Sequence, residues 1–205
     1  MTFFSKRGGK MEKILEHTID YHEIIECITC ALDAKDPYTA GHSKRVSDMT
    51  LKVCELLGLK KEEAEKIHIA AHLHDIGKIG VPDAILNKEG KLDQTEWEAI
   101  RRHPSIGAQI LSKSTHLSEL KNIVLCHHER YDGNGYPSGL KGAQIPVGAR
   151  IIAICDSIDA MMSTRSYRKA HDSVFCYGQI EQNLGKMYDP MIGSYVLEHW
   201  EEIIC

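Results

Sequence analysis

Side chains of the kinds that bind metal ions recur at five separate places along this 205-residue chain. The most prominent is a His-Asp doublet inside the segment AHLHDIGK, and four shorter motifs (GHS, RHP, CHHE and ICD) supply the others. The seven candidate metal ligands are His42, His74, Asp75, His103, His127, His128 and Asp156. Imidazole and carboxylate donors without thiolate suit iron or manganese better than a structural zinc. The set predicts metal-assisted hydrolysis at a site for two divalent ions.

The spacing of the doublet indicates how Asp75 could act. Adjacent residues on a helix point about 100° apart, so His74 and Asp75 can share a site only at its edge. A carboxylate has two oxygens, and Asp75 is therefore predicted to bridge the two ions. Lys78 follows one turn later on the same face, where it could contact a substrate phosphate or the attacking water. Asp156 lies in an apolar run, where a carboxylate is costly to bury unless it is paired or metal-bound.

The remaining histidines are not assigned to the metal ions. His72 lies two residues before His74 and is predicted to face away, either as a core residue or as a support behind the metal ligands. Two histidines of the first helix, His17 and His22, have no partner motif. The others are expected on solvated helix faces, and these are His68, His116, His171 and His199.

Composition narrows the class of protein. The chain is 42% hydrophobic and 26% charged, as ordinary globular proteins are, and its net charge of −4 argues against a nucleic-acid coat protein. We find no apolar run long enough to span a membrane and no secretory signal at the N-terminus. Seven cysteines without disulfide-framework spacing suit the reducing cytoplasm. The pair Cys27 and Cys30 is expected to be two small core residues.

Hydrophobic spacing predicts an all-α fold with one domain. Residues 1–15 are expected to be a flexible N-terminal lead-in and residues 16–205 a helical bundle around the metal site. A Gly/Pro-rich loop is expected at 131–140, and Asp93 with Glu96 forms a predicted capping box. No segment shows the alternation of a strand. Helices are expected at about 18–34, 39–57, 60–76, 93–102, 105–111, 117–128, 147–162, 171–184 and 190–203.

These motifs together resemble the HD-GYP family, a branch of the HD phosphohydrolases. The resemblance covers about residues 20–203, and its most specific part is the loop Asp132-Gly-Asn-Gly-Tyr-Pro137. It implies an HD-type helical bundle around a dinuclear site, in a bacterial signalling phosphodiesterase that hydrolyses cyclic di-GMP to linear pGpG and/or GMP through a metal-bridging hydroxide. One ion would take His42, His74, Asp75 and Asp156, and the other would take Asp75, His103, His127 and His128.

The resemblance also implies which residues act on the substrate. Asp75 and Lys78 would be catalytic. The expected substrate contacts are Lys78, Asp132, Gly135, Tyr136, Pro137, Arg165 and Arg168. Some family members carry a glutamate four residues before the first histidine and hold three metal ions. That position is Tyr38 here, which favours two ions.

Other functions remain open from the sequence. The chain could bind a cyclic dinucleotide without cutting it, or act on another nucleotide as general HD hydrolases do. It could also be an interaction domain, and its sensor or receiver partner would then be a separate protein or another part of a longer one. We expect a cytoplasmic enzyme with no membrane span.

Overall fold

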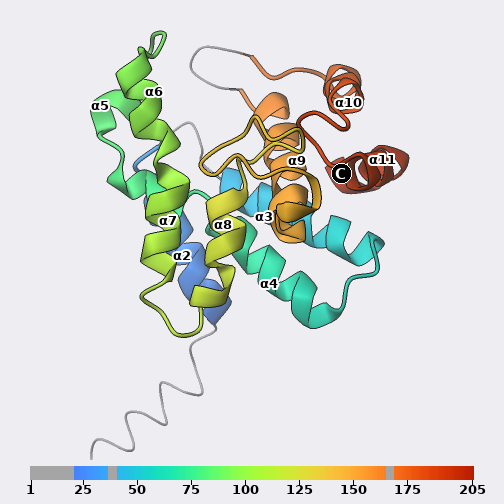
Figure 1. The fold of residues 1–205 in the computed structure, drawn as a ribbon, viewed down its shortest axis with the longest axis horizontal. Coiled ribbons are helices and arrows are strands. Elements are labelled where there is room, and N and C mark those ends of the chain that lie inside the picture. The colour runs from blue at the N-terminus through green and yellow to red at the C-terminus, as the bar shows by residue number, and fades with distance from the viewer. Residues whose placement is uncertain (1–20, 37–40, 165–168) are drawn as a thin grey trace, which may run out of the picture.

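The computed structural model describes residues 21–36, 41–164 and 169–205, and its regular structure is helical, which confirms the predicted fold class (Figure 1). Within these ranges the one strand-like pairing is an isolated bridge between Leu184 and Tyr188. The expected boundary at residue 15 lies outside the described residues. The α-helices are α2 (Tyr21–Asp33), α3 (His42–Leu56), α4 (Lys61–His72), α5 (Asp83–Leu86), α6 (Gln94–Arg101), α7 (His103–Leu111), α8 (Lys121–Cys126), α9 (Val147–Met162), α10 (Ser173–Gln182), α11 (Pro190–Glu198) and α12 (Trp200–Ile204). The 3-10 helices are η2 (Ile76–Gly80), η3 (Ser118–Leu120) and η4 (Gly142–Gln144).

Helix α9 packs against α3, with α8 on one side and α10 on the other, and α7 lies beyond α8 (Figure 1). Its bounds are those expected from the apolar run. Four of its isoleucines are completely buried, namely Ile151, Ile152, Ile154 and Ile158. Because α9 packs against α3, Asp156 and Asp159 of α9 face His42 at the start of α3.

Helix α4 is shorter than predicted, and this correction matters for the site. The expected helix reaches residue 76, but α4 ends at His72, and turn residues 73–75 lead into η2. The Nδ1 atom of His74 lies 2.7 Å from the carbonyl oxygen of Ala71. At this end of the helix a backbone carbonyl therefore accepts a hydrogen bond from a side chain. The chain then continues with i to i+3 bonds, from the amide of Ile76 to Leu73 and from Lys78 to Asp75.

Three other expectations about the elements are corrected. His103 does not close the helix before it but begins α7. Pro104 lies in the first turn, where backbone amides have no partner within the helix, so the missing N–H of proline costs no helical hydrogen bond. The predicted C-terminal helix breaks at His199 into α11 and α12. Cys27 and Cys30 are exposed on α2 instead of buried. The capping box of Asp93 and Glu96 is confirmed.

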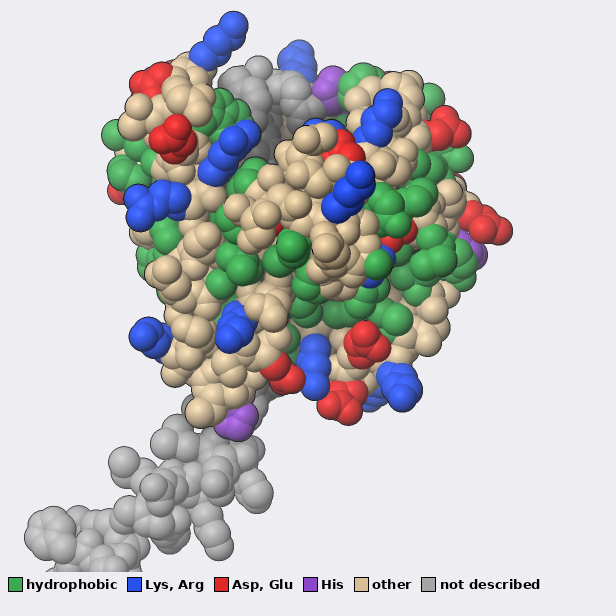
Figure 2. All heavy atoms as spheres, in the orientation of Figure 1, with side chains coloured by type: hydrophobic (Ala, Val, Ile, Leu, Met, Phe, Trp, Pro, Cys, Tyr) green, Lys and Arg blue, Asp and Glu red, His purple; other side chains and the backbone are tan. Residues whose placement is uncertain are grey.

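The surface carries charges of both signs. Figure 2 shows lysine and arginine side chains interspersed with acidic ones and with apolar areas on the face displayed. Among the described residues, no helix has the length and apolar character needed to cross a bilayer.

Candidate metal centre

Three histidines are aimed into one site by the same local device. The Nδ1 atoms of His74, His103 and His127 lie 2.7, 2.8 and 2.7 Å from the carbonyl oxygen three residues earlier. A carbonyl can only accept, so each Nδ1 carries the proton and each Nε2 presents a lone pair. Metal-binding histidines are typically oriented in this way by a carbonyl acceptor on the far nitrogen. The three rings are almost fully buried.

Asp75 lies at the middle of this site. Its Oδ2 is 3.4 Å from Nε2 of His74, and its Oδ1 is 3.2 Å from Nε2 of His103. The turn after α4 makes this possible, because on a continued helix the two members of the doublet would diverge. One carboxylate therefore faces histidines from two different elements, as a bridging ligand requires.

His42 enters the site from the first turn of α3. Its Nε2 lies 3.3 Å from Asp156 and 4.0 Å from Asp75, and its Nδ1 lies 2.6 Å from Oδ2 of Asp159. Asp159 also accepts two hydrogen bonds from Arg45, of 2.6 and 3.1 Å. Although burial opposes the charge, the hydrogen bonds to Asp156 and Asp159 raise the pKa of His42 to about 9.

Lys78 and Asp75, three residues apart, stabilise each other's charges. Nζ of Lys78 lies 2.8 Å from Oδ2 of Asp75 and 3.4 Å from Asp36. Burial alone would raise the pKa of Asp75, but Lys78 and His74 hold it well below its usual range. Burial alone would lower the pKa of Lys78, but Asp75 and Asp36 raise it. Asp75 therefore stays ionised and Lys78 stays protonated at neutral pH.

The donor set fits a pair of divalent ions. The ligand atoms fall into two compact groups, one with His42, His74 and Asp75 and the other with His103, His127 and His128. Burial lowers the pKa of His127 and His128, that of His128 to about 4, so both are neutral imidazoles. Among the described side chains, Nε2 of His74 is one of the few buried polar atoms without a hydrogen-bond partner. A buried polar atom of this kind calls for a partner, and a bound metal ion would be that partner.

Gly77 allows η2 to pack tightly on α7. A Cβ atom at this position would lie 1.9 Å from the carbonyl oxygen of His103 and 2.6 Å from the amide of Gly107. A side chain there would push the two backbones apart. Glycine therefore sets the distance between Asp75, which precedes η2, and His103.

The Gly-Tyr-Pro loop closes over one edge of the site. The ring of Tyr136 stacks on His128 with centroids 4.9 Å apart, and its amide donates to the His128 carbonyl oxygen. The guanidinium of Arg101, the last residue of α6, lies 5.2 Å from the centre of the Tyr136 ring. The buried carboxylate of Glu129 fixes the loop, since it accepts bonds from the amides of Ser138 and Leu140 at 2.7 and 3.0 Å.

A cavity of about 910 Å³ opens beside the candidate ligands. Its polar wall includes Lys78, and its other wall comes from α5, α6 and the segment between them. Of the predicted substrate contacts, Lys78 and Tyr136 line it. The residues of the seven-ligand set that line it are His42, Asp75, His103, His128 and Asp156. His74 and His127 lie deeper, behind them.

Other predicted contacts lie elsewhere in the loop. Asp132 forms a two-point ion pair with Arg130 and caps the amide of Asn134 at 2.9 Å. At Gly135 a Cβ would lie 2.2 Å from the amide of Arg130, so this residue permits a close backbone approach. Neither residue lines the cavity, nor does Pro137. Their contact with a substrate stays a prediction.

Arg165 and Arg168, the predicted basic clamp, lie outside the described residues, as does Tyr38. The metal count inferred from Tyr38 therefore stays a prediction.

Sequence reasoning did not assign three residues that support the site. Asp159 supports His42, Asp36 pairs with Lys78, and Glu129 holds the loop. Asp159 could have been found, because it follows Asp156 by three residues on the same apolar helix and so shares its face. Asp36 gives no such local signal.

One histidine expectation is corrected. His68, expected on a solvated face, is buried, and His22, which has no partner motif in the sequence, lies against His68 and His72. Helix α4 turns His68 inward toward α3, where its Nδ1 donates to the carbonyl oxygen of Ser47 at 3.0 Å. His72 is buried as predicted and contributes to this second group, not to the metal centre.

A helical fold that gathers five histidines and two aspartates in one buried site is typical of metal-dependent hydrolases. The family model described as "HD domain" matches residues 26–192. The chain therefore belongs to the HD-domain family.

Several characterised proteins are similar to this chain, and they confirm the resemblance to the HD-GYP branch. It is 39% identical over 183 residues to a cyclic di-GMP phosphodiesterase of Thermotoga maritima, covering 88% of this chain and 50% of that protein. It is 41% identical over 170 residues to the cyclic di-GMP phosphodiesterase response regulator RpfG of Xanthomonas campestris, covering 82% and 45%. It is 36% identical over 185 residues to 3'3'-cGAMP-specific phosphodiesterase 2 of Vibrio cholerae, covering 89% and 35%.

Solved structures share the fold. A cyclic GMP-AMP specific phosphodiesterase of Vibrio cholerae superimposes with a TM-score of 0.67 at 19% identity, over 88% of this chain and 48% of that one. The HD domain of the Listeria monocytogenes phosphodiesterase PgpH, in complex with cyclic di-AMP, gives 0.58 at 20% identity, over 86% and 96%. The chain spans about a third to a half of the length of the three sequence relatives described above.

Proposed function

We propose that this chain is a metal-dependent phosphodiesterase that hydrolyses cyclic di-GMP to pGpG and/or GMP. The observation that carries the proposal is the placement of Asp75, whose two carboxylate oxygens face histidines of two separate groups at 3.4 and 3.2 Å. The names of the similar proteins support a cyclic dinucleotide as substrate. The loop with Tyr136 at the edge of the site supports it as well.

The proposed cofactor is a pair of divalent ions, iron or manganese. His42, His74, Asp75 and Asp156 would hold one ion, and Asp75, His103, His127 and His128 would hold the other. These residues would hold ions whose chemistry is Lewis-acid activation of the phosphodiester and a lower pKa for the attacking water. The buried, partnerless Nε2 of His74 supports this assignment.

The protein's own groups would then orient the substrate and neutralise its charge. Lys78 stays protonated and lies within the cavity, so it can move from Asp75 onto a phosphoryl oxygen as charge develops there. Asp159 holds His42 in the orientation that presents Nε2 to the site. Tyr136 is stacked on His128 and lines the cavity, and Arg101, whose guanidinium lies 5.2 Å from the centre of the Tyr136 ring, could contact a purine base there.

The lining of the cavity supports a nucleotide ligand. It includes five of the candidate metal ligands and Lys78 together with the apolar side chains of Trp97 and Ile100. Phosphates would lie beside the candidate metal ligands and Lys78, and a base against the apolar side chains. The volume of about 910 Å³ falls within the range of small-molecule sites.

The test pairs metal analysis with turnover. Asp75→Ala and His74→Ala, compared with His116→Gln on the exposed surface, should lose bound iron or manganese and lose hydrolysis of cyclic di-GMP. Full activity without bound metal would overturn the proposal. A panel of cyclic di-GMP, cyclic GMP-AMP and cyclic di-AMP identifies the preferred substrate, because the similar proteins differ in this respect. Saturable binding without any product would instead indicate a binding module.

The regulatory input is also proposed. We expect a sensor or receiver, on another protein or elsewhere in a longer chain, to control a cytoplasmic enzyme of this kind. Pull-down of candidate receivers with the full chain tests binding. The hydrolysis rate measured with and without a bound receiver tests control.

A further inference from the structure

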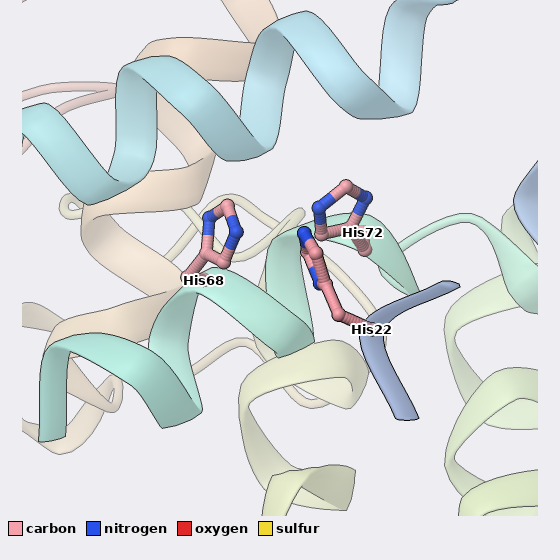
Figure 3. A group of neighbouring side chains, drawn as sticks. All are labelled: His22, His68 and His72. Atoms are coloured by element: carbon pink, nitrogen blue, oxygen red, sulfur yellow. The ribbon is translucent and has the colours of Figure 1, made fainter. Parts of the chain in front are cut away.

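A second group of three histidines lies apart from the residues assigned to the catalytic centre. His68 and His72 stand one turn apart on α4, and His22 reaches them from α2 (Figure 3). The ring centroids are 4.8 Å apart for His68 and His72, 4.9 Å for His22 and His72, and 5.3 Å for His22 and His68. One ring nitrogen from each residue lies within 4.8 Å of the other two.

The hydrogen bonds of Ser47, on α3, define which nitrogens of α4 carry protons. Nδ1 of His68 lies 3.0 Å from the Ser47 carbonyl oxygen and must donate to it, so Nε2 of His68 has a lone pair. The Ser47 hydroxyl donates its single proton to the carbonyl oxygen of Lys44 at 2.8 Å. At 2.9 Å from Nε2 of His72 it can therefore only accept, which leaves the lone pair of His72 on Nδ1.

That nitrogen of His72 is the decisive observation. His72 is 1% exposed, and within the described part of the chain its Nδ1 is a buried polar atom without a hydrogen-bond partner. Leaving such an atom unsatisfied costs about 1–3 kcal/mol. Packing alone gives no reason for three imidazoles here, because an apolar side chain would fill the same space without that cost.

We propose that His22, His68 and His72 bind a divalent transition-metal ion such as Zn²⁺, at a site separate from the catalytic centre. Three imidazoles with an open fourth position form a well-known tetrahedral zinc arrangement. The oriented far nitrogens of His68 and His72 match the way in which metal-binding histidines are usually supported.

The geometry needs only a small adjustment. Zinc–nitrogen bonds of about 2.1 Å place tetrahedral nitrogens about 3.4 Å apart, so nitrogens that now lie within 4.8 Å of one another must approach by up to about 1.4 Å. His22 can supply this movement, since its side chain is 41% exposed. Glu26, whose carboxylate lies 3.8 Å from Nε2 of His22, is near enough to offer a fourth ligand in place of water.

The bound ion would join α2 to α4. Helix α2 buries Ile25, Thr29 and Leu32, while Ile24 and Ile28 remain partly exposed, so its apolar anchoring is modest. A metal ion at its first turn would fix this helix, and α2 leads directly to Asp36, the partner of Lys78.

The test counts zinc ions in the full chain. Protein stripped with a chelator is equilibrated with Zn²⁺, freed of excess metal and analysed by elemental mass spectrometry. Wild type and His116→Gln should hold one zinc ion more per chain than His22→Gln and His72→Gln. If His72→Gln does not fold, His22→Gln decides alone, because this partly exposed side chain is not part of the core. Equal zinc content in wild type and His22→Gln overturns the proposal.

A second readout is independent of the catalytic centre. Co²⁺ in a four-coordinate site absorbs visible light much more strongly than octahedral Co²⁺. The Co²⁺ protein should lose this absorption in His22→Gln and keep it in Asp75→Ala. The reverse pattern would assign the band to the catalytic centre and contradict the second site. Loss of hydrolysis in Asp75→Ala, by contrast, bears only on the proposed phosphodiesterase.

Discussion

The Nδ1 atom of His42 lies 2.6 Å from a carboxylate oxygen of Asp159, although 117 residues separate the two in the chain. The other carboxylate oxygen of Asp159 accepts a hydrogen bond of 2.6 Å from Arg45. Asp159 thus fixes the ring of His42 from behind while Nε2 of His42 faces Asp156 and Asp75. A carboxylate in this position orients a metal ligand and increases its basicity.

Asp159→Asn should weaken metal binding without removing a ligand. Loss of such a support typically costs about 10- to 100-fold in affinity. Calorimetric titration of Mn²⁺ into protein that has been stripped of metal with a chelator measures the change in affinity. Asp83→Asn, at an exposed position on α5, is the matched control and should bind as wild type does. Unchanged affinity in Asp159→Asn would show that His42 needs no such support or is not a ligand.

Lys78→Met should lower kcat while the bound metal is kept. Lys78 is the buried cation beside Asp75, and loss of one such stabilising group typically costs about 10²- to 10³-fold. Steady-state hydrolysis of cyclic di-GMP, together with metal content, separates the two effects. The control is Lys52→Met on the exposed face of α3. If kcat is unchanged, Lys78 only balances the charge of Asp75.

Gly77→Ala should destabilise the protein and disturb the centre. The new methyl group would meet the His103 carbonyl oxygen at 1.9 Å, a backbone atom that cannot move aside. Overpacking of this kind costs about 1–3 kcal/mol or more in the free energy of unfolding. The matched control is Gly178→Ala in α10, where a Cβ meets nothing within 4 Å. That change should stabilise by about 0.5–1 kcal/mol, since alanine is the better helix former. Urea unfolding measures both, and equal stabilities would refute the close packing.

The stability of the metal-free protein should peak near neutral pH. The pKa of His128 falls from 6.5 to about 4 in the folded state, so the unfolded chain binds more protons between these values. Its contribution is complete above pH 6.5 and is lost as the pH falls to about 4. The pKa of His42 rises to about 9, so its contribution is complete below pH 6.5 and is lost as the pH rises to about 9.

Each of these histidines changes the free energy of unfolding by up to about 1.4 kcal/mol per pH unit. Urea unfolding of the metal-free protein from pH 4 to 9 measures how its free energy of unfolding depends on pH. His128→Gln should flatten its acid side alone. An acid side identical to that of wild type would show that His128 does not titrate as described.

The sequence alone determined the helical class, the apolar helix α9 and the seven candidate ligands. These depend on local signals: hydrophobic spacing, a proline before α9, and imidazoles and carboxylates in places where packing does not require them. The distinctive loop at Asp132–Pro137 also identified the family, because its residue types are unusual in a helical chain.

Only the tertiary structure decided what each group faces. Asp75 meets His103, and Asp159 meets His42, because helices distant in sequence pack together, and no local pattern encodes such contacts. The same is true of His22, which gains His68 and His72 as neighbours when α2 lies on α4. The end of α4 at His72 was also hidden, since a side-chain bond from His74 replaces a helical one. Residue types follow from local chemistry, whereas their partners follow from packing over the whole chain.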